Sequence, residues 1–169
     1  MMMALSLLLL RLVIGLIFVG HGAQKLFGIF GGHGLAGTTQ FMSQLGLHPA
    51  KGWAIIAALA EFVGGLLLAL GLFTPLASLF IIGVMLVAIT RVHWNKGFWS
   101  SQGGYEYNVV LIALAVVLGL LGAGAYSLDA VFGFFVPEPQ IFLYGLLALL
   151  ILLAVAMVLV PWLGQHAHA

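Results

Sequence analysis

Residues 53–93 have the sequence WAIIAALAEFVGGLLLALGLFTPLASLFIIGVMLVAITRVH. This stretch holds two apolar runs, Trp53–Phe73 and Pro75–His93, and each is long enough to cross the ~30 Å core of a bilayer as a helix, which takes ~20 residues. Backbone polar groups find no partner in lipid, so such runs form helices. The turn between them is very short, and Pro75 suits the first turn of the second helix. The stretch therefore predicts a transmembrane helical hairpin.

Three further apolar windows lie on either side of this hairpin: Ala4–Gln24, Tyr107–Gly124 and Ile141–Trp162. The whole chain is 64% hydrophobic and 5% charged, whereas soluble domains carry roughly 25% charged residues. We therefore expect an all-α fold, a polytopic membrane helical bundle whose main solvent is lipid.

The chain divides into a four-helix membrane domain, residues 1–131, and a C-terminal part, residues 132–169. The second part begins with a linker around Pro137-Glu138-Pro139 and continues as a fifth transmembrane helix and a short tail. This fifth helix carries no polar group inside the bilayer. We expect it to be peripheral, facing lipid or a partner.

Composition also excludes several classes of function. With no cysteine, the chain forms no disulfide, thiolate metal site or iron–sulfur cluster. A net charge of +1 without a basic run argues against a nucleic-acid partner. The first 22 residues lack the basic start and the cleavage site of a secretory signal, so they are predicted to remain as the first membrane helix.

The connections between the windows carry the remaining polar residues. After a Gly-rich start, residues 38–46 predict a short interfacial helix, with Thr38 or Thr39 as its N-cap and Gly46 as its stop. Residues 91–106 are rich in Trp and Tyr, as in an interfacial aromatic belt.

Basic residues predict the orientation of the chain in the membrane. Lys25 and Lys51 bound the first loop, and Arg91 and Lys96 lie in the third. The positive-inside rule therefore places the first and third loops in the cytoplasm, with the N-terminus outside.

Two charged residues, Arg11 and Glu61, lie well inside predicted spans. Such charges are costly in lipid and indicate function by default. Counted from the ends of their helices, their depths differ by only ~5 Å, so we expect an Arg11–Glu61 ion pair inside the bundle. Such a pair either fixes the register of two helices or belongs to a functional site. Small residues share a face with each charge and predict close helix packing: Gly15 and Gly22 with Arg11, and Gly64, Gly65 and Gly71 with Glu61.

Histidines form the next polar feature. His21 and His93 should lie on the side of the first and third loops, together with Lys25 and Glu106. Two histidines from different helices are able to hold haem or a metal. The alternative is that they are interfacial residues with satisfied hydrogen bonds, which we prefer because their spacing matches no metal motif.

Four segments taken in order resemble the DoxX family of small bacterial and archaeal membrane proteins. They are LRLVIGLIFVGHGAQKLFG (10–28), ALAEFVGGLLLALGLFTPLAS (58–78), VHWNKGFW with GGYEYN (92–108), and GAGAYSLDA (122–130). The resemblance implies that the family's polar positions correspond here to Arg11, Lys25, Glu61, His93 and Glu106, and its Gly-x-Gly-x-x-Ser-Leu-Asp element to Gly122, Gly124, Ser127 and Asp129. Four spans are usual in the family, so the fifth helix is a departure.

The resemblance also implies a redox setting in a plasma (inner) membrane. Family members include a subunit of thiosulfate:quinone oxidoreductase and membrane partners in oxidative-stress complexes. Our leading hypothesis is a membrane protein that binds a lipophilic redox ligand, a quinone, within an oxidoreductase system. The alternatives are a non-catalytic accessory subunit of a larger membrane complex or a homo-oligomer, and then a small transporter or lipid-handling protein.

Overall fold

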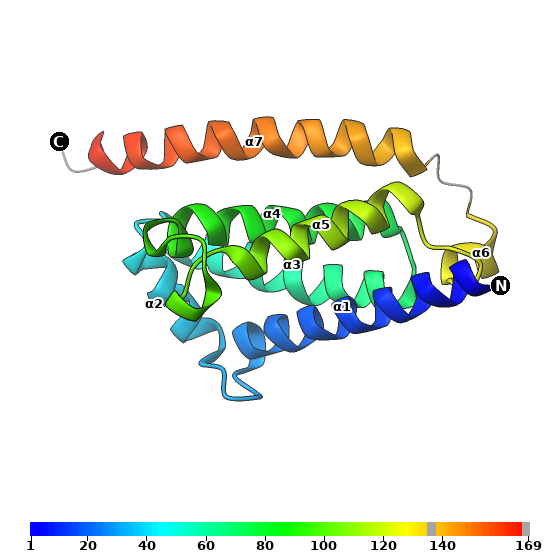
Figure 1. Cartoon of the computed structure of the whole chain (residues 1–169). Helices are drawn as coiled ribbons and strands as arrows, with labels where there is room; N and C mark the ends of the chain where they lie inside the picture. The colour runs from blue at the N-terminus through cyan, green and yellow to red at the C-terminus, as the bar shows by residue number, and fades with distance from the viewer. Residues whose placement is uncertain (135–137, 167–169) are drawn as a thin grey trace.

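The computed structural model describes the backbone of residues 1–134 and 138–166, and the side chains of residues 1–134 and 139–157. Figure 1 shows the long helices lying roughly side by side, with α7 on one side of the molecule and α1 on the opposite side. Within the described residues the secondary structure is entirely helical, so the predicted all-α class is confirmed. The long helices are α1 (Met2–Phe27), α3 (Ala50–Leu70), α4 (Thr74–Ala88), α5 (Glu106–Leu121) and α7 (Glu138–His166).

The predicted hairpin is formed by α3 and α4. Gly71 ends α3 with φ 64°, the left-handed conformation that glycine adopts without a steric penalty. Pro75 lies in the first turn of α4, as expected. Beyond Ala88 the helical path continues as a single π-helical turn, η1 (Ile89–His93), and a 3₁₀ turn, η2 (Trp94–Lys96).

Helices α1 and α3 pack closely and antiparallel because both present glycine. A Cβ atom on Gly15 would lie 2.6 Å from the backbone N of Ala69, and one on Gly65 would lie 2.6 Å from the carbonyl O of Gly15. Gly22 faces the backbone of Phe62 in the same way. These contacts fix the register: seven residues forward along α1 correspond to seven residues back along α3.

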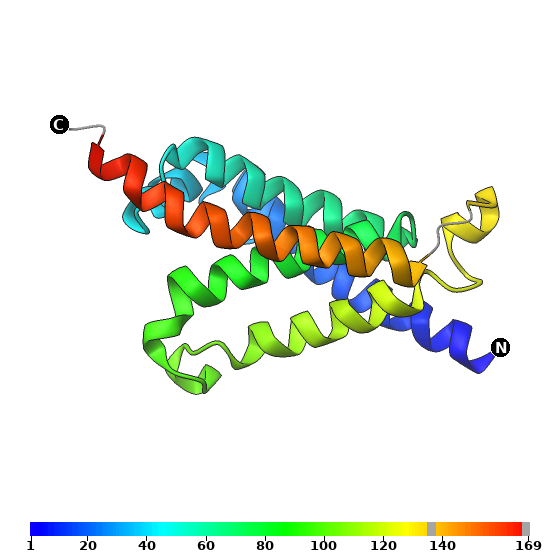
Figure 2. The same cartoon turned by 90° about the horizontal axis from the view of Figure 1, so that it is seen from above.

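Helices α4 and α5 form a second antiparallel hairpin, and Figure 2 shows the two diverging toward the connection that joins them. Helix α7 covers this hairpin with one face, where the ring of Phe142 is fully buried against Gly119 of α5. The opposite face of α7 is exposed, which agrees with the predicted peripheral position of this helix.

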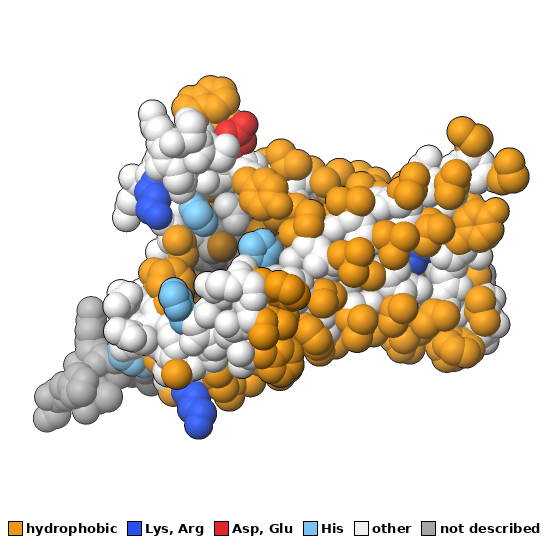
Figure 3. Space-filling model, turned by 90° about the horizontal axis from the view of Figure 1, so that it is seen from below, with side chains coloured by type: hydrophobic (Ala, Val, Ile, Leu, Met, Phe, Trp, Pro, Cys, Tyr) orange, Lys and Arg blue, Asp and Glu red, His pale blue; other side chains and the backbone are white. Residues whose placement is uncertain are grey.

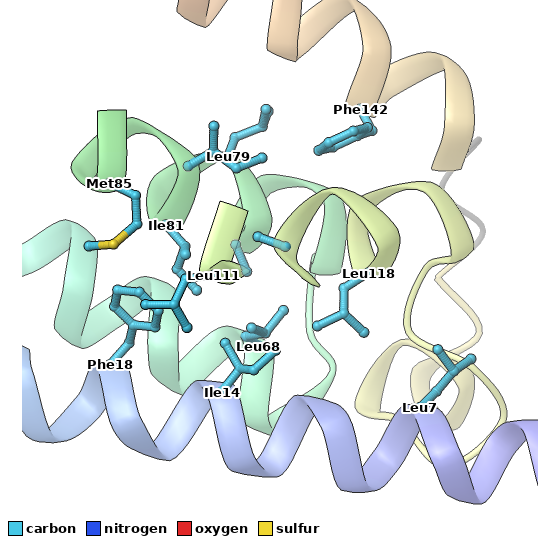
Figure 4. Packing of buried hydrophobic residues seen from close by; sticks show 13 residues of the cluster. Leu7, Ile14, Phe18, Leu68, Leu79, Ile81, Met85, Leu111, Leu118 and Phe142 are labelled. Carbon is cyan, nitrogen blue, oxygen red and sulfur yellow. The ribbon is translucent and has the colours of Figure 1, made fainter. Parts of the chain in front are cut away.

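The core runs along the interior of the bundle between α1, α3, α4 and α5. Figure 4 shows Ile14 and Leu68 meeting across the α1–α3 contact, with Leu118 of α5 nearby. Toward the end of the bundle where α4 and α5 diverge, the same cluster ends in Phe18 and Met85.

Three short helices complete the described fold: α2 (Gly34–Gln44), η3 (Ser100–Gln102) and α6 (Leu128–Phe132). Helix α2 begins four residues before the predicted 38–46 segment. Thr38 is therefore not an N-cap; its hydroxyl donates to the carbonyl of Gly34 inside the helix, at 2.8 Å. Gly46 lies just after the helix with φ 71°, as expected of a stop.

Length and apolarity suit four described segments to membrane spans: Met2–Phe27, Ala50–Leu70, Thr74–Lys96 and Pro139–Met157. Helix α5 is apolar but has 16 residues, so it is shorter than the predicted window of residues 107–124. Gly122 has φ 74° and ends the helix early. The chain is a polytopic helical membrane bundle.

Candidate functional site

A cavity of about 910 Å³ opens at the end of the bundle where α4 and α5 diverge from each other (Figure 2). Side chains of α1, α2 and α3 form one wall, those of α4, η1 and α5 form the other, and Leu149 and Leu153 of α7 contribute from outside. In Figure 3 the surface is hollowed at this end, and histidine side chains lie around the hollow. Most of the lining is apolar, so the cavity suits a lipophilic molecule.

Lys25 and Glu61 form an ion pair on the α1–α3 wall of this cavity. The Lys25 ammonium donates to Glu61 Oε2, and the side chains are 28% and 4% exposed respectively. Glu61 is thus neutralised from a neighbouring helix, as a charge inside a bundle requires. The result is a polar feature without net charge that borders an apolar cavity.

His21 and His93 line the same cavity from different walls. One ring nitrogen of His21, Nδ1, lies 3.2 Å from Oε1 of Gln24. His93 Nδ1 lies 2.6 Å from the carbonyl O of Gly103. A carbonyl only accepts, so Nδ1 of His93 carries the proton, and in the neutral ring Nε2 is a hydrogen-bond acceptor.

The π-helical turn η1 places His93 at the cavity. Such turns insert one extra residue into a helix and are frequent at functional sites. Within the described residues no group of three or more His, Asp or Glu side chains could hold a metal ion.

Glu106 does not line the cavity. Its Oε2 accepts from the backbone N–H and from the hydroxyl of Ser100, both at 2.9 Å, at the start of α5. These two hydrogen bonds from Ser100 stabilise the Glu106 carboxylate in its charged form. Glu106 holds the 97–105 connection in place, next to the cavity mouth formed in part by Ser100.

The predicted Arg11–Glu61 pair is wrong, because Glu61 is bound by Lys25. Gly22 faces Phe62, the neighbour of Glu61, and Arg11 lies eleven residues before Gly22, about 16 Å along the axis. The depth estimate assumed that the start of α1 and the end of α3 lie at the same level. In fact the first turns of α1 extend past the α3–α4 turn, so equal counts from the ends are not equal depths.

Arg11 belongs to a second polar cluster at the other end of the bundle. It is fully buried, and its Nη2 donates to the carbonyl O of Tyr126 at 2.5 Å. The guanidinium lies against Gly71, where a Cβ atom would collide with it. Asp129 supplies a nearby negative charge that attracts Arg11.

Asp129 connects this cluster to the α3–α4 turn. Its backbone N–H donates to the carbonyl of Gly71 at 3.1 Å, and its Oδ1 accepts from the backbone N of Phe73 at 3.1 Å. Phe73 has φ 48°, an uncommon conformation for a residue with a side chain. The cluster therefore joins α1, the α3–α4 turn and the 122–134 segment, and this is a structural role.

Sequence reasoning missed Asn108 as a cavity residue. It is 5% exposed and lies on the α5 wall. An uncharged polar residue near a helix end does not stand out in sequence as a charge does. The signal available was its place in an apolar window, two residues after Glu106.

Comparison with known proteins agrees with this architecture. The DoxX family model matches residues 6–94, which covers α1 to the start of the α4–α5 connection. A protein of Bacillus subtilis (strain 168) is 32% identical over 122 residues, 72% of this chain and 83% of its own length. The chain belongs to the DoxX family.

The names of these relatives differ in what they say. The Bacillus subtilis protein is named "Putative oxidoreductase CatD". "Inner membrane protein YphA" of Escherichia coli (strain K12) is 33% identical over 132 residues, 73% of this chain and 87% of its own length. "Inner membrane protein YqjF" of the same organism is 28% identical over 123 residues, with 72% and 88% covered. No solved structure matches the chain.

Proposed function

We propose that this DoxX protein binds a quinone in the cavity bounded by α1, α2 and α3 and by the α4–α5 hairpin. In this proposal it is the membrane part of an inner-membrane oxidoreductase system. The observation that carries the proposal is the charge-neutral Lys25–Glu61 pair on the wall of an apolar cavity of about 910 Å³. A quinone has an apolar ring and tail and only a few hydrogen-bond acceptors, so it matches an apolar cavity with few polar groups.

The balance of charge favours a neutral headgroup over an anionic one. Lys25 is already paired with Glu61, and no other Lys or Arg of the described residues lines the cavity. A fatty acid or phospholipid would bring a charge that lacks a counter-ion in a low-dielectric site. A quinone carbonyl needs only a donor, which the Lys25 ammonium supplies.

Reduction of a quinone takes two electrons and two protons. In this proposal the two histidines that line the cavity, His21 and His93, transfer the protons. Nδ1 of His93 is bonded to the carbonyl of Gly103, so Nε2 is its other ring nitrogen, and both His93 and Ser100 line the cavity. The electrons come from a separate donor protein in this proposal. The name of the Bacillus subtilis relative is consistent with redox function.

The test is quinone binding by the full chain in lipid nanodiscs, measured by equilibrium titration with a decyl-tailed para-benzoquinone. We expect saturable binding by the unsubstituted protein and weaker binding by Lys25→Met. Lys51→Met is the matched control, because Lys51 is an exposed lysine at the same end of the bundle. A folded protein that binds no quinone would overturn the proposal.

The same sample tests haem, the ligand in the less favoured interpretation of His21 and His93. Both histidines line the cavity, so a bis-histidine haem would give a sharp visible absorption band in the purified protein. That band, with no quinone binding, would replace the quinone proposal with a haem one.

The accessory-subunit proposal rests on α7, whose exposed side chains include Leu143, Leu147 and Leu150. Such a face suits lipid or a neighbouring membrane helix equally well. Crosslinking in membranes followed by co-purification separates the two: a stoichiometric partner, or a second copy, favours the accessory role. The transporter proposal ranks last because the chain is short and shows no inverted repeat.

A further inference from the structure

Asn108 is a polar side chain without an adequate partner in the protein. It is 5% exposed, and its Nδ2 donates to the sulfur of Met85 at 3.3 Å. A carboxamide has two N–H donors and an oxygen acceptor, and a thioether is a weak acceptor. Among the described residues no other hydrogen bond to this amide is formed. Most of its hydrogen-bonding capacity is therefore unused.

Burying an amide in this way costs free energy unless something else bonds to it. A leucine at position 108 would fill the same apolar space without that cost. Asn108 lines the cavity, as does Met85 beside it. Figure 4 places Met85 at the end of the core cluster, across from Phe18, and both residues also border the cavity. The unused amide groups and the ligand space are thus in the same place.

Asn108 also lines the cavity from a different helix than the charged pair does. Lys25 and Glu61 belong to α1 and α3, whereas Asn108 belongs to α5. A ligand between these walls meets hydrogen-bonding groups on two sides, with apolar side chains such as Phe18 and Leu111 around it. A headgroup that matches has polar atoms at two separate positions of a flat ring.

We propose that Asn108 is a specificity-determining residue that binds one oxygen of a para-quinone, while the Lys25–Glu61 pair contacts the opposite oxygen. The inference rests on the proposed quinone function and names the ring substitution that the site selects. The amide suits both redox states, because its N–H donates to a carbonyl and its oxygen accepts from the hydroxyl of a quinol. A ligand with a single polar end leaves one wall unsatisfied.

The experiment compares two probes on the full chain in nanodiscs. One is the decyl-tailed para-benzoquinone, and the other is decylbenzene, which has the same tail on a flat six-membered carbon ring but no oxygen. The unsubstituted protein should bind the quinone more tightly. Asn108→Leu should weaken quinone binding about fivefold, the usual effect of one neutral hydrogen bond. Binding of decylbenzene should stay the same, because that probe makes no hydrogen bond.

Two controls separate recognition from packing. Asn95→Leu makes the same change at an exposed position in η2 and should alter neither affinity. Met85→Leu removes the sulfur acceptor but keeps the volume; because Met85 lines the cavity, affinity is free to change, but it should change equally for both probes, since a thioether donates no hydrogen bond to a quinone oxygen. If Asn108 only holds Met85 in place, Asn108→Leu will weaken both probes alike, which overturns the inference.

The outcomes also distinguish the inference from the function on which it rests. If the unsubstituted protein binds quinone and Asn108→Leu binds it equally well, the assignment of Asn108 is wrong and the quinone function stands. If the unsubstituted protein does not prefer quinone over decylbenzene, both are wrong. A loss confined to the quinone probe in Asn108→Leu supports both.

Discussion

At the scale of single residues, the Lys25–Glu61 pair is unequal in its exposure. The Glu61 side chain is 4% exposed and the Lys25 side chain 28%. A lysine that loses its partner extends its long chain toward the membrane surface, where water solvates the ammonium. A buried glutamate has no such route. The two partners therefore depend on the pair to different degrees.

This inequality predicts an asymmetric response to substitution. Lys25→Met leaves the buried Glu61 carboxylate without its counter-charge and should lower the free energy of unfolding by about 3–5 kcal/mol. Glu61→Gln leaves only a lysine that reaches water and should cost about 1 kcal/mol. The double variant should be more stable than Lys25→Met alone, since it contains no unpaired charge. Thermal unfolding in one detergent measures all three, and a larger loss for Glu61→Gln would refute the argument.

The partners of the two basic residues on α1, Arg11 and Lys25, follow from helix geometry once the register between α1 and α3 is known. Side chains in an α-helix lean toward its N-terminus. That tilt carries the Arg11 guanidinium away from Glu61, toward the carbonyl of Tyr126, and carries the Lys25 ammonium back toward Glu61. The sequence placed Arg11 and Glu61 inside the bundle and Lys25 at the first loop, but which basic residue pairs with Glu61 depends on the register between α1 and α3.

At the scale of elements, the α1–α3 contact depends on how closely two backbones approach. A Cβ atom on Gly15 would lie 2.6 Å from backbone atoms of Ala69 and Gly65, which cannot move without shifting α3. Gly20 is also in α1, but a Cβ atom there would meet nothing within 4 Å. The same helix thus contains a glycine that packing requires and one that it does not.

We predict opposite effects for alanine at these two positions. Gly15→Ala should destabilise the protein by about 1–3 kcal/mol, because overpacking forces the helices apart. Gly20→Ala should be neutral or stabilising by up to about 1 kcal/mol, since alanine has the better helix propensity. Thermal unfolding of both variants in the same detergent is the measurement. Equal losses would mean that glycine serves chain flexibility here rather than close packing.

The presence of the long helices was predictable from the lengths of the apolar runs, but the residues at which the helices begin and end were not. Helix α2 begins at Gly34 rather than near Thr38 because the threonine hydroxyl bonds within the helix, to the carbonyl of Gly34. Helix α5 ends at Leu121 because Gly122 turns the backbone. The π-helical turn at His93 has no sequence signature. The cavity was not predictable either, because it lies where α4 and α5 diverge (Figure 2), and the sequence does not show the angle between two helices.

At the scale of the whole molecule, polar residues are divided between the two ends of the bundle. The cavity, with Lys25 and His93, lies at the end where α2 and the α4–α5 connection meet, and the Arg11–Asp129 cluster lies at the other end, beside α6 (Figure 1). One end is hollow and the other is joined by hydrogen bonds among three segments.

This division predicts which positions share a side of the membrane. Because the chain contains no cysteine, single variants Lys51→Cys, Lys96→Cys and Val131→Cys each report one site, and the unsubstituted chain is the unlabelled control. Lys51 and Lys96 are exposed at the cavity end, and Val131 is 74% exposed in α6 at the other end. The positive-inside rule predicts that a membrane-impermeant maleimide labels position 131 in intact spheroplasts, and labels positions 51 and 96 only in inverted vesicles. Labelling of 51 and 96 from outside and 131 from inside would reverse the orientation and keep the fold. Labelling of 51 and 96 from opposite sides would contradict the fold, because both loops lie at one end of the same bundle.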